Sequence, residues 1–469
     1  MNLTKLTLEN FRCFEHLKIN FHPNLTVIVA ENGQGKSTVL DAIRIGLWPF
    51  VSSFDLARSS FNDPNNAIRV DDVRLVRLTS RDMARQLPTR IVILGDYGEG
   101  QAKTWERYRD KEAPLTKTRD DSGTAAMKQW ATAMQARIRD PEQSSASLPV
   151  LGYYGTGRLW AQKKLTEFTR GKDDTEGADF YIRTFAYLNC LDPSSTYKHF
   201  KEWFTWATFV YVERVMDYME GKSAEAPVHA ADGPILAVRH AIDCFLQPTT
   251  GWHSLEYSHS HEKSLVLRHP QLGTLKVEML SDGIRSVLAM IGDIAYRCIR
   301  LNPHLGGEAP RETEGVVLID EIDMHLHPRW QQMVVGQLRE AFPKIQFIVT
   351  THSPQVLTTV KRENIRLLGR DAEGAWYASP PQQETKGVES GVALNDAMHV
   401  NPIPPVDEAG WLADYTAMIE AGTYEDAEGL ALRQKLLALY GLRHPIILDA
   451  ERLIRFQAFK LRKKSNPQD

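Results

Sequence analysis

The chain has 469 residues, of which 42% are hydrophobic and 25% are charged, and its 56 Lys and Arg residues nearly balance its 59 Asp and Glu residues. This composition predicts a globular protein with a sizeable core and excludes a chain that is disordered throughout. The formal net charge of -3 neither requires nor excludes a polyanionic partner, and the length accommodates several domains of roughly 150 residues.

The cysteines are Cys13, Cys190, Cys244 and Cys298. They lie far apart without a Cys-x-x-Cys pair, which predicts free thiols in a reducing compartment. No apolar run reaches the roughly 18 to 20 residues of a membrane helix, and the chain does not open with a basic stretch followed by an apolar run. We therefore expect a cytoplasmic protein with no membrane partner.

The first third of the chain predicts one lobe of an α/β domain. Residues 3–30 contain three short strand patterns, and the last, over 25–30, is apolar enough to be buried on both faces of a parallel sheet. A glycine-rich loop follows, and then a helix from Ser37 to about Trp48. Alternating apolar and polar residues over 65–110 predict further strands with one solvent-exposed face. We assign residues 1–110 to the N-terminal lobe of a head domain.

Residues 111–253 are predicted to form a linker and a helical insertion. Ser195 is a favourable N-cap for a helix that extends to Gly221. A shorter helix is predicted over residues 235–246, ending at Pro248. The longer helix carries four aromatic residues that we expect in its core rather than on a ligand-stacking surface: Trp203, Phe204, Trp206 and Phe209.

Strand patterns resume near residue 254 and alternate with helices. A helix follows Ser281, a strand covers residues 315–320, a helix lies near residues 330–342, and a strand covers 345–350. This alternation predicts an α/β sheet, and we assign residues 254–370 to the C-terminal lobe of the head. Residues 371–469 are the predicted C-terminal helical region, for partner binding or oligomerisation.

The loop between the buried strand and the first helix has the sequence Ala-Glu-Asn-Gly-Gln-Gly-Lys-Ser-Thr. Backbone N–H groups of such a turn, with the positive end of the following helix, form a cradle for phosphate oxygens. Lys36 is expected to reach the β- and γ-phosphates of ATP, and the Ser37 hydroxyl to bind Mg²⁺. The candidate nucleotide-binding residues of the loop are Asn32, Gly33, Gln34, Gly35, Lys36, Ser37 and Thr38.

The first position of this loop departs from the usual pattern, because Ala30 stands where a phosphate loop has glycine. If the position needs a positive φ, the Cβ atom costs roughly 1 kcal/mol or more, whereas at a negative φ the methyl group costs little. We expect ATP binding to be retained and hydrolysis to be slow.

Three further segments carry polar or ionisable side chains next to the ends of predicted strands and helices. Asp320 and Glu321 follow a buried strand, where Asp320 suits Mg²⁺ binding and Glu321 suits a base that orients the attacking water. Residues 281–283 precede a helix and form a second potential anion cradle. His352 follows the strand over 345–350 and is placed to contact a γ-phosphate or the water. The alternatives are a purely structural acidic pair, a Ser-capped helix and a loop histidine satisfied by its neighbours.

The order of the phosphate loop, LSDGIRS, LIDEID and TTHSP resembles the ATP-binding-cassette heads of the SMC and RecF class, and NFRCF near the start resembles their opening motif. The resemblance implies that Arg12 lies beside the nucleotide, Asp323 belongs to the D-loop and His352 is the switch histidine. It also implies that Ser281, Asp282 and Gly283 complete the site of a second subunit in trans. Two heads would then sandwich two ATP molecules, and an isolated subunit would be nearly inert.

The glutamine loop expected in this class cannot be assigned from the sequence. Arg158 in YYGTGRLW is a candidate phosphate or partner contact, with an Arg stacked on its own tyrosines as the alternative.

Three longer segments are similar to the PtuA-type ATPases of Septu and certain retron anti-phage systems: YYGTGRLW, DEIDMHLHPRWQ and ALYGLRHPIILDAERLIRFQAFK. This resemblance implies an oligomeric regulatory ATPase, a homodimer or higher homo-oligomer, without a nuclease centre of its own. It further implies that the nucleotide state controls a small HNH nuclease subunit, called PtuB in that family, and it leaves open a contact with DNA or RNA, such as the msDNA of a retron.

Two other classes stay open. A RecF- or SMC-like repair ATPase would bind DNA ends, but it usually carries long coiled coils or a DNA-binding lobe, and the sequence has no sustained heptads. An OLD-type nuclease needs a Toprim domain after the head. The segment DAEG over 371–374 is acidic, but no buried strand is predicted in front of it.

Two smaller clusters have conservative interpretations. His325 and His327 flank Leu326 without a partner Cys or His at zinc spacing, so we do not expect a metal site there. A basic cluster near the C-terminus is expected to be a solvated helix face, with nucleic acid or an acidic partner as the alternative contact: Arg452, Arg455, Lys460, Arg462, Lys463 and Lys464.

Overall fold

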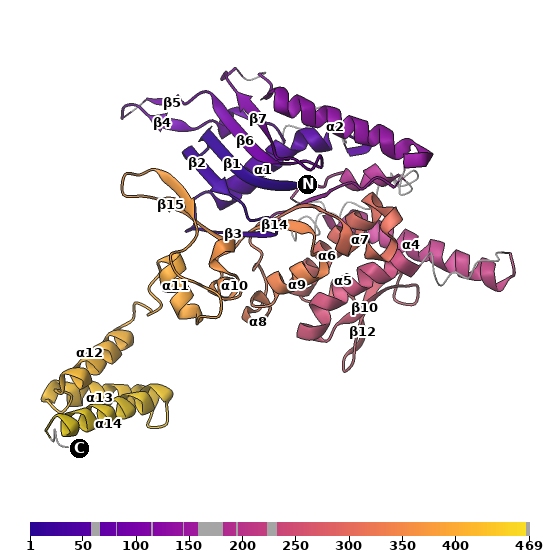
Figure 1. Cartoon of the computed structure of the whole chain (residues 1–469). Helices are drawn as coiled ribbons and strands as arrows, with labels where there is room; N and C mark the ends of the chain where they lie inside the picture. Colours follow the sequence, from indigo (N-terminus) through magenta and orange to yellow (C-terminus); the bar gives the residue numbers. More distant parts are fainter. Residues whose placement is uncertain are drawn as a thin grey trace. The chain divides into compact units, whose positions relative to one another are not determined.

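The computed structural model describes residues 1–57, 66–80, 82–113, 116–143, 145–157, 182–193, 196–222 and 232–465. The chain divides into two compact units, Met1–Met398 and His399–Asp469 (Figure 1). The predicted boundary at residue 371 lies inside the first unit, because helix α11 (Ser390–Met398) packs against α10 (Pro354–Leu357). The other predicted boundaries, at 111 and 254, also lie within the first unit.

One sheet of the first unit is antiparallel, in the strand order β2-β1-β6-β7-β8. Its strands are β1 (Asn2–Phe11), β2 (Phe14–Asn20), β6 (Thr89–Asp96), β7 (Lys103–Arg109) and β8 (Arg119–Asp120). Burial alternates along β6, which confirms the strand with one exposed face that the alternating pattern predicts there. Helices α1 (Lys36–Val51) and α2 (Ser122–Arg139) pack against this sheet. A small hairpin joins β4 (Leu75–Arg77) to β5 (Met83–Arg85).

The central sheet has the order β16-β15-β3-β14-β13-β9. Its strands are β3 (Leu25–Val29), β9 (Val150–Tyr154), β13 (Gly315–Ile319), β14 (Ile345–Thr350), β15 (Ile365–Arg370) and β16 (Trp376–Ser379). All pairs are parallel except the one between β15 and β16. Strands β3, β13 and β14 are buried along their whole length, as the apolar runs predict. Strand β9 is equally buried, although it lies in the segment predicted to be a linker and helical insertion, so that prediction is wrong at residues 150–154. The α/β class is therefore confirmed.

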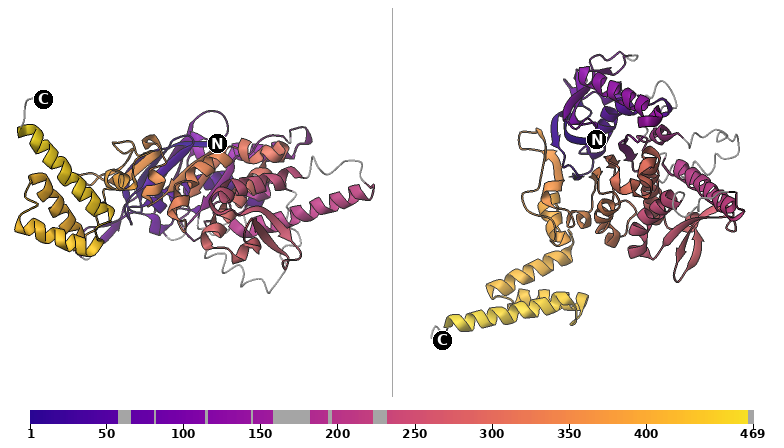
Figure 2. Two further views of the ribbon diagram at one scale, coloured as in Figure 1. Left: turned by 90° about the horizontal axis from the view of Figure 1, so that it is seen from below. Right: turned by 45° about the vertical axis from the view of Figure 1, so that its right-hand side comes forward.

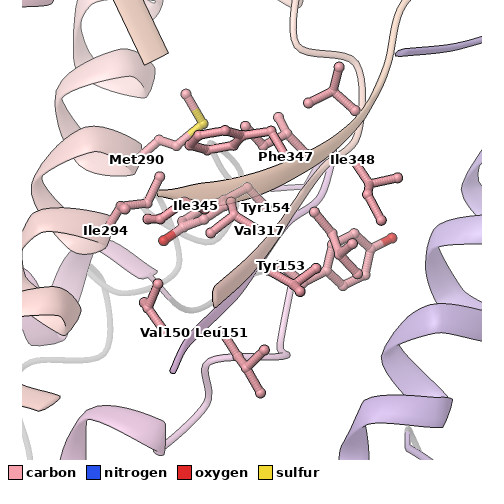
Figure 3. Close-up of a cluster of buried hydrophobic side chains, with 14 of the residues drawn as sticks. Val150, Leu151, Tyr153, Tyr154, Met290, Ile294, Val317, Ile345, Phe347 and Ile348 are labelled. Atoms are coloured by element: carbon pink, nitrogen blue, oxygen red, sulfur yellow. The ribbon is translucent and has the colours of Figure 1, made fainter. Parts of the chain in front are cut away.

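Helix α6 (Asp282–Leu301) covers one face of the central sheet. Figure 3 shows Met290 and Ile294 of α6 beside buried side chains of β9 and β14. Tyr153 and Tyr154 point to opposite faces of the sheet, as neighbours on a strand must (Figure 3). Because the parallel strands share one direction, their carboxyl ends release the functional loops at one edge.

The insertion contains α4 (Thr196–Met219) and α5 (Asp232–Thr250), which both pack on α6, and the end of α4 extends away from them (Figure 2, left). A three-stranded sheet of β10 (His253–Ser258), β11 (Ser264–His269) and β12 (Gly273–Lys276) follows. The predicted end of α5 at Pro248 is wrong. The helix continues to Thr250, whose hydroxyl donates to the carbonyl of Leu246 at 2.6 Å, and Gly251 with φ 78° follows.

The aromatic residues of α4 divide into two groups. Trp203 and Phe204 are buried, as expected of core residues, and Trp206 is partly buried. Phe209 is 44% exposed and packs against Tyr257, with ring centroids 5.3 Å apart. The predicted N-cap, Ser195, lies outside the described residues.

Two sequence expectations for the C-terminal lobe need correction. The helix predicted near 330–342 is two helices, α8 (Pro328–Gln331) and α9 (Val334–Ala341), and a further short helix, α7 (Ala309–Glu312), precedes β13. A buried strand, β15, does precede residues 371–374. That segment is the exposed turn of the β15–β16 hairpin, where the Asp371 N–H donates to the carbonyl of Ala375 at 3.0 Å.

The second unit is helical, consisting of α12 (Asp407–Ala421), α13 (Ala427–Tyr440) and α14 (Pro445–Ser465). A small separate core holds these helices together: Tyr415, Ile419, Leu432, Leu436, Ile447 and Ala450. Helix α12 ends at Gly422, which has φ 81°. Among the helices in the described parts of the chain, none combines the length and apolarity needed to cross a bilayer.

Candidate nucleotide-binding site

The phosphate loop joins β3 to α1 and takes the conformation that its glycines permit. Gly33 and Gly35 have φ of 79° and 90°, a region that L-residues avoid. A Cβ atom on Gly35 would also lie 2.5 Å from Cζ of Phe14, so the turn after β1 closes directly on the loop. Ala30 does not have a positive φ, so its methyl group costs little. The loop therefore keeps its shape without the usual first glycine.

Lys36 is buried, and its ammonium group donates to the carbonyls of Ala30 at 3.0 Å and Glu31 at 3.1 Å. Burial lowers the pKa of Lys36, and Asp320, Glu321 and Asp323 oppose that shift. The lysine and the three carboxylates therefore share one electrostatic environment, although 284 or more positions separate them in the sequence (320 minus 36).

His352 belongs to the same cluster. Burial lowers the pKa of His352, Lys36 lowers it further, and the carboxylates of Asp323, Glu321 and Asp320 act in the opposite direction. The net lowering favours the neutral imidazole near neutral pH. The structure thus brings together the phosphate loop, the acidic pair and the histidine that the sequence selects.

Thr350, the last residue of β14, organises the two carboxylate positions. Its hydroxyl donates to Oδ1 of Asp320 at 2.6 Å and accepts from the N–H of Glu321 at 2.8 Å. The N–H of Asp320 donates to the carbonyl of Tyr154 at 2.8 Å, which ties it to the neighbouring strand β9. Thr350 was not predicted from the sequence, because a threonine inside a strand pattern carries no signal of its own.

Glu321 has φ 48°, an unusual value for a residue with a long side chain. Such strain is concentrated at functional positions, where the surrounding structure maintains it. Asp323 is held as well, since its Oδ1 accepts from the Thr351 hydroxyl at 2.5 Å and its carbonyl accepts from Gln331 at 3.3 Å. The acidic segment is therefore fixed to both β14 and α8.

Arg12 lies in the turn beside the phosphate loop, with φ 49°. Its guanidinium donates to Oδ1 of Asp72 and to Oδ2 of Asp41, each at 2.7 Å, and Arg44 pairs with Asp41 at 3.1 Å. Burial lowers the pKa of Arg12, but Asp41 and Asp72 outweigh it and the net pKa is raised. Asp41 and Asp72 were missed because their link to Arg12 exists only in the folded chain.

The predicted signature segment begins helix α6. Ser281 is the N-cap, but its side chain caps no N–H of the helix, and Ser281 and Asp282 are exposed. Asp282 pairs with Arg285. A Cβ atom on Gly283 would lie 2.5 Å from the carbonyl oxygen of His325, so the glycine permits α6 to pack on the segment after Asp323.

Other sequence candidates have less to contribute. Nδ1 of His327 accepts from the N–H of Arg329 at 3.3 Å as the N-cap of α8, and His325 has φ 62°. Arg452, Arg455 and Lys460 are exposed on α14. Arg158 and the side chains of Arg462, Lys463 and Lys464 lie outside the described residues.

Two family models match this chain. Residues 5–202 match a model described as an AAA domain, and residues 254–358 match one described as "AAA domain, putative AbiEii toxin, Type IV TA system". These ranges contain the phosphate loop and the acidic segment, respectively. With the sheet order described above, they confirm the predicted α/β fold of a P-loop ATPase head, with a helical insertion and a helical C-terminal region.

Relatives are similar over most of the chain. The chain is 27% identical to "Retron Ec83 probable ATPase" of Escherichia coli, covering 92% of this chain and 82% of the relative. It is 26% identical to "Retron Vc95 probable ATPase" of Vibrio cholerae (78% and 73%) and 22% identical to "Septu protein PtuA" of Bacillus thuringiensis (80% and 78%). The predicted similarity to PtuA-type and retron ATPases is confirmed.

Among solved structures, an Smc head bound to the C-winged helix domain of ScpA aligns with 81% of this chain and 97% of its own, at 15% identity and a TM-score of 0.47.

Proposed function

We propose that this chain is the ATP-hydrolysing regulatory subunit of an anti-phage defence complex, converting ATP and water to ADP and phosphate. The observation that carries the proposal is the convergence of Lys36, the acidic pair Asp320 and Glu321, and His352 at one edge of the central sheet. The names of the relatives, retron probable ATPases and Septu PtuA, support the defence setting.

The residues around Lys36 fit an ATP-bound Mg²⁺ ion. Ser37 and Asp320 offer the hard oxygen ligands that Mg²⁺ prefers. The described residues contain no group of three or more His, Cys, Asp or Glu side chains that could hold a metal, and bound nucleotide and water would supply further oxygen ligands. When bound, Mg²⁺ neutralises charge on the phosphate oxygens.

The side chains have complementary tasks in this proposal. The N–H groups of residues 32–38 and the Lys36 ammonium group hold the phosphates. Glu321 accepts a hydrogen bond from the attacking water and orients it in line with the γ-phosphate. His352, neutral because its pKa is lowered, hydrogen-bonds the γ-phosphate, and Arg12 lies beside the nucleotide.

The signature segment acts on a second copy of the chain. Ser281 is exposed and its hydroxyl caps nothing in its own helix, which suits a contact with the γ-phosphate bound by a partner head. We infer a homodimer, or a higher homo-oligomer, with Asp282, Gly283 and the D-loop residue Asp323 at the interface. Its nucleotide state biases the assembly toward holding or releasing a PtuB-like HNH nuclease, since ATP favours the state that binds it more tightly.

The test is to measure ATP hydrolysis and mass in solution for the native chain, Lys36→Ala and Glu321→Gln. We expect Lys36→Ala to lose ATP binding, and Glu321→Gln to bind ATP, lose hydrolysis and accumulate as a closed dimer. Unchanged hydrolysis in Glu321→Gln removes Glu321 from the mechanism. Plasmid cleavage by the purified chain with Mg²⁺ or Mn²⁺ contradicts a purely regulatory role.

A further inference from the structure

A cavity of about 180 Å³ lies between α4, α5 and the C-terminal end of α6, at the opposite end of α6 from Ser281. We call it the insertion pocket. Its walls include Trp203, Trp206, Tyr211, Arg214, Ile235 and Arg300. The Trp203 ring packs against Tyr296 of α6, with centroids 5.1 Å apart, so this wall is fixed to the core of the head.

Arg300 places a positively charged guanidinium group in the wall of the insertion pocket. Its Nε and Nη2 atoms are buried and have no hydrogen-bond partner in the structure. Burial lowers the pKa of Arg300, and among the described residues Tyr296 opposes this shift while no carboxylate compensates the charge. A buried guanidinium without a counter-charge is costly, and it therefore favours an anion that can enter the cavity.

Arg297, one turn earlier on α6, is an arginine whose charge is compensated within the fold. It is 1% exposed, and its Nε donates to Oδ2 of Asp293 at 2.7 Å. The Tyr154 hydroxyl donates to the same carboxylate oxygen at 2.8 Å. Arg297 is thus paired within the chain, whereas no carboxylate among the described residues pairs with Arg300.

Two more guanidinium groups strengthen the positive potential at the pocket. Arg214 on α4 lines it and is exposed. Arg183 lies close enough that the charge of Arg300 contributes to lowering its pKa, after burial as the main cause. Arg183 donates to the carbonyls of Leu301 and Ala146, each at 2.8 Å, which holds it near the end of α6.

We propose that the insertion pocket binds one nucleoside phosphate unit, either a free nucleotide or a unit of a single strand. Its phosphate lies on Arg300 and Arg214 and its base against Trp206 and Tyr211. Guanidinium groups match phosphate oxygens, and aromatic rings stack on bases of any sequence. A carboxylate side chain would satisfy the arginines but would not stack on the aromatic rings. This site is separate from the phosphate loop and does not depend on ATP hydrolysis.

The experiment uses the full chain in a Lys36→Ala background, so that the phosphate loop no longer contributes nucleotide binding. AMP is titrated by calorimetry, and a fluorescein-labelled 12-nucleotide oligothymidylate by anisotropy, against Arg300→Gln and Arg214→Gln. Arg268→Gln is the matched control, because Arg268 is exposed on β11 and pairs with Glu256 at 2.8 Å. We expect Arg300→Gln to weaken binding about tenfold, Arg214→Gln to weaken it less, and Arg268→Gln to change it little.

The AMP and oligothymidylate titrations together distinguish a free nucleotide from a single strand as the ligand. AMP binding as tight as oligonucleotide binding assigns the pocket to a free nucleotide, and binding of the oligonucleotide alone assigns it to a single strand. Thermal unfolding separates binding from structure, because removing an uncompensated buried charge should not lower the melting temperature. Three results overturn the proposal: no effect of Arg300→Gln and Arg214→Gln on either ligand, equally tight binding of a polyglutamate peptide, or a lowered melting temperature with unchanged binding.

Discussion

The hydroxyl of Thr350 donates to Oδ1 of Asp320 at 2.6 Å, and Oγ1 of Thr350 accepts from the N–H of Glu321 at 2.8 Å. One side chain at the end of β14 therefore sets both carboxylate positions at the end of β13. Since Thr350 and Asp320 are buried, this alignment does not depend on solvent. Thr350 acts as a positioning residue for the proposed hydrolysis.

Thr350→Val removes the hydroxyl while keeping the side-chain shape. We expect ATP hydrolysis to fall about 10- to 100-fold, as for other residues that orient the groups around a metal, while ATP affinity changes much less. The matched control is Thr26→Val, a buried threonine on β3 whose hydroxyl accepts from the N–H of His22 rather than contacting a carboxylate. Equal losses of hydrolysis in the two variants would show that Thr350 acts only through stability.

The positive φ of Glu321 predicts a trade-off between stability and activity. Glu321→Gly and Glu321→Ala should both lose hydrolysis, but the glycine variant should be more stable than the alanine variant by about 1 kcal/mol, because only glycine adopts φ 48° without strain. Denaturant unfolding measures the difference. At Asp323, which has no positive φ, the order should reverse and alanine should be the more stable replacement. The same order at both positions would argue against strain at Glu321.

The lowered pKa of His352 predicts how ATP hydrolysis depends on pH at acidic values. Its pKa is lowered from 6.5, mainly by burial, so the folded protein keeps a neutral imidazole at pH 6.5. Hydrolysis by the native chain should therefore persist through pH 6.5 and fall only at lower pH. The unfolded chain binds the proton first, so the contribution of His352 to stability is complete above pH 6.5 and is lost as the pH falls toward the folded pKa.

The control for this profile is His352→Gln, since other histidines titrate in the same range. Its hydrolysis should be slower at every pH but should lack the acid limb assigned to the imidazole. An identical acid limb in the native chain and in His352→Gln would assign the titration to another group.

The sequence predicted well what depends on local pattern. The apolar run before the phosphate loop, the acidic pair after residues 315–319 and the histidine after residues 345–350 are all local motifs, and the parallel sheet brings their ends to one edge. Ala30 was a genuine ambiguity, because φ at that position depends on the whole loop. Only the structure resolves it, in favour of a negative value.

What the sequence could not predict depends on distant partners. Asp72 reaches Arg12 from 60 positions away, and Thr350 contacts Asp320 from the neighbouring strand, 30 positions away, so no spacing rule connects them. Pro248 misled the prediction of a helix end, because threonine hydroxyls in the last turn of α5 bond to its carbonyls. The uncompensated charge of Arg300 has no signal in the sequence either, since it differs from Arg297 in that no carboxylate of the described residues lies beside it in the folded head.

The signature segment predicts complementation between two inactive chains. Ser281→Arg should abolish hydrolysis without preventing ATP binding to its own phosphate loop, and Lys36→Ala should abolish ATP binding while leaving its signature intact. In a mixed dimer, the phosphate loop of the first variant meets the signature of the second, so one of the two sites is complete. An equimolar mixture should recover about a quarter of the native rate, because half of the dimers are mixed and each has one working site. The control is a chain carrying both substitutions, which should restore nothing to either single variant. If the mixture stays inactive although mixed dimers form, Ser281 does not act in trans.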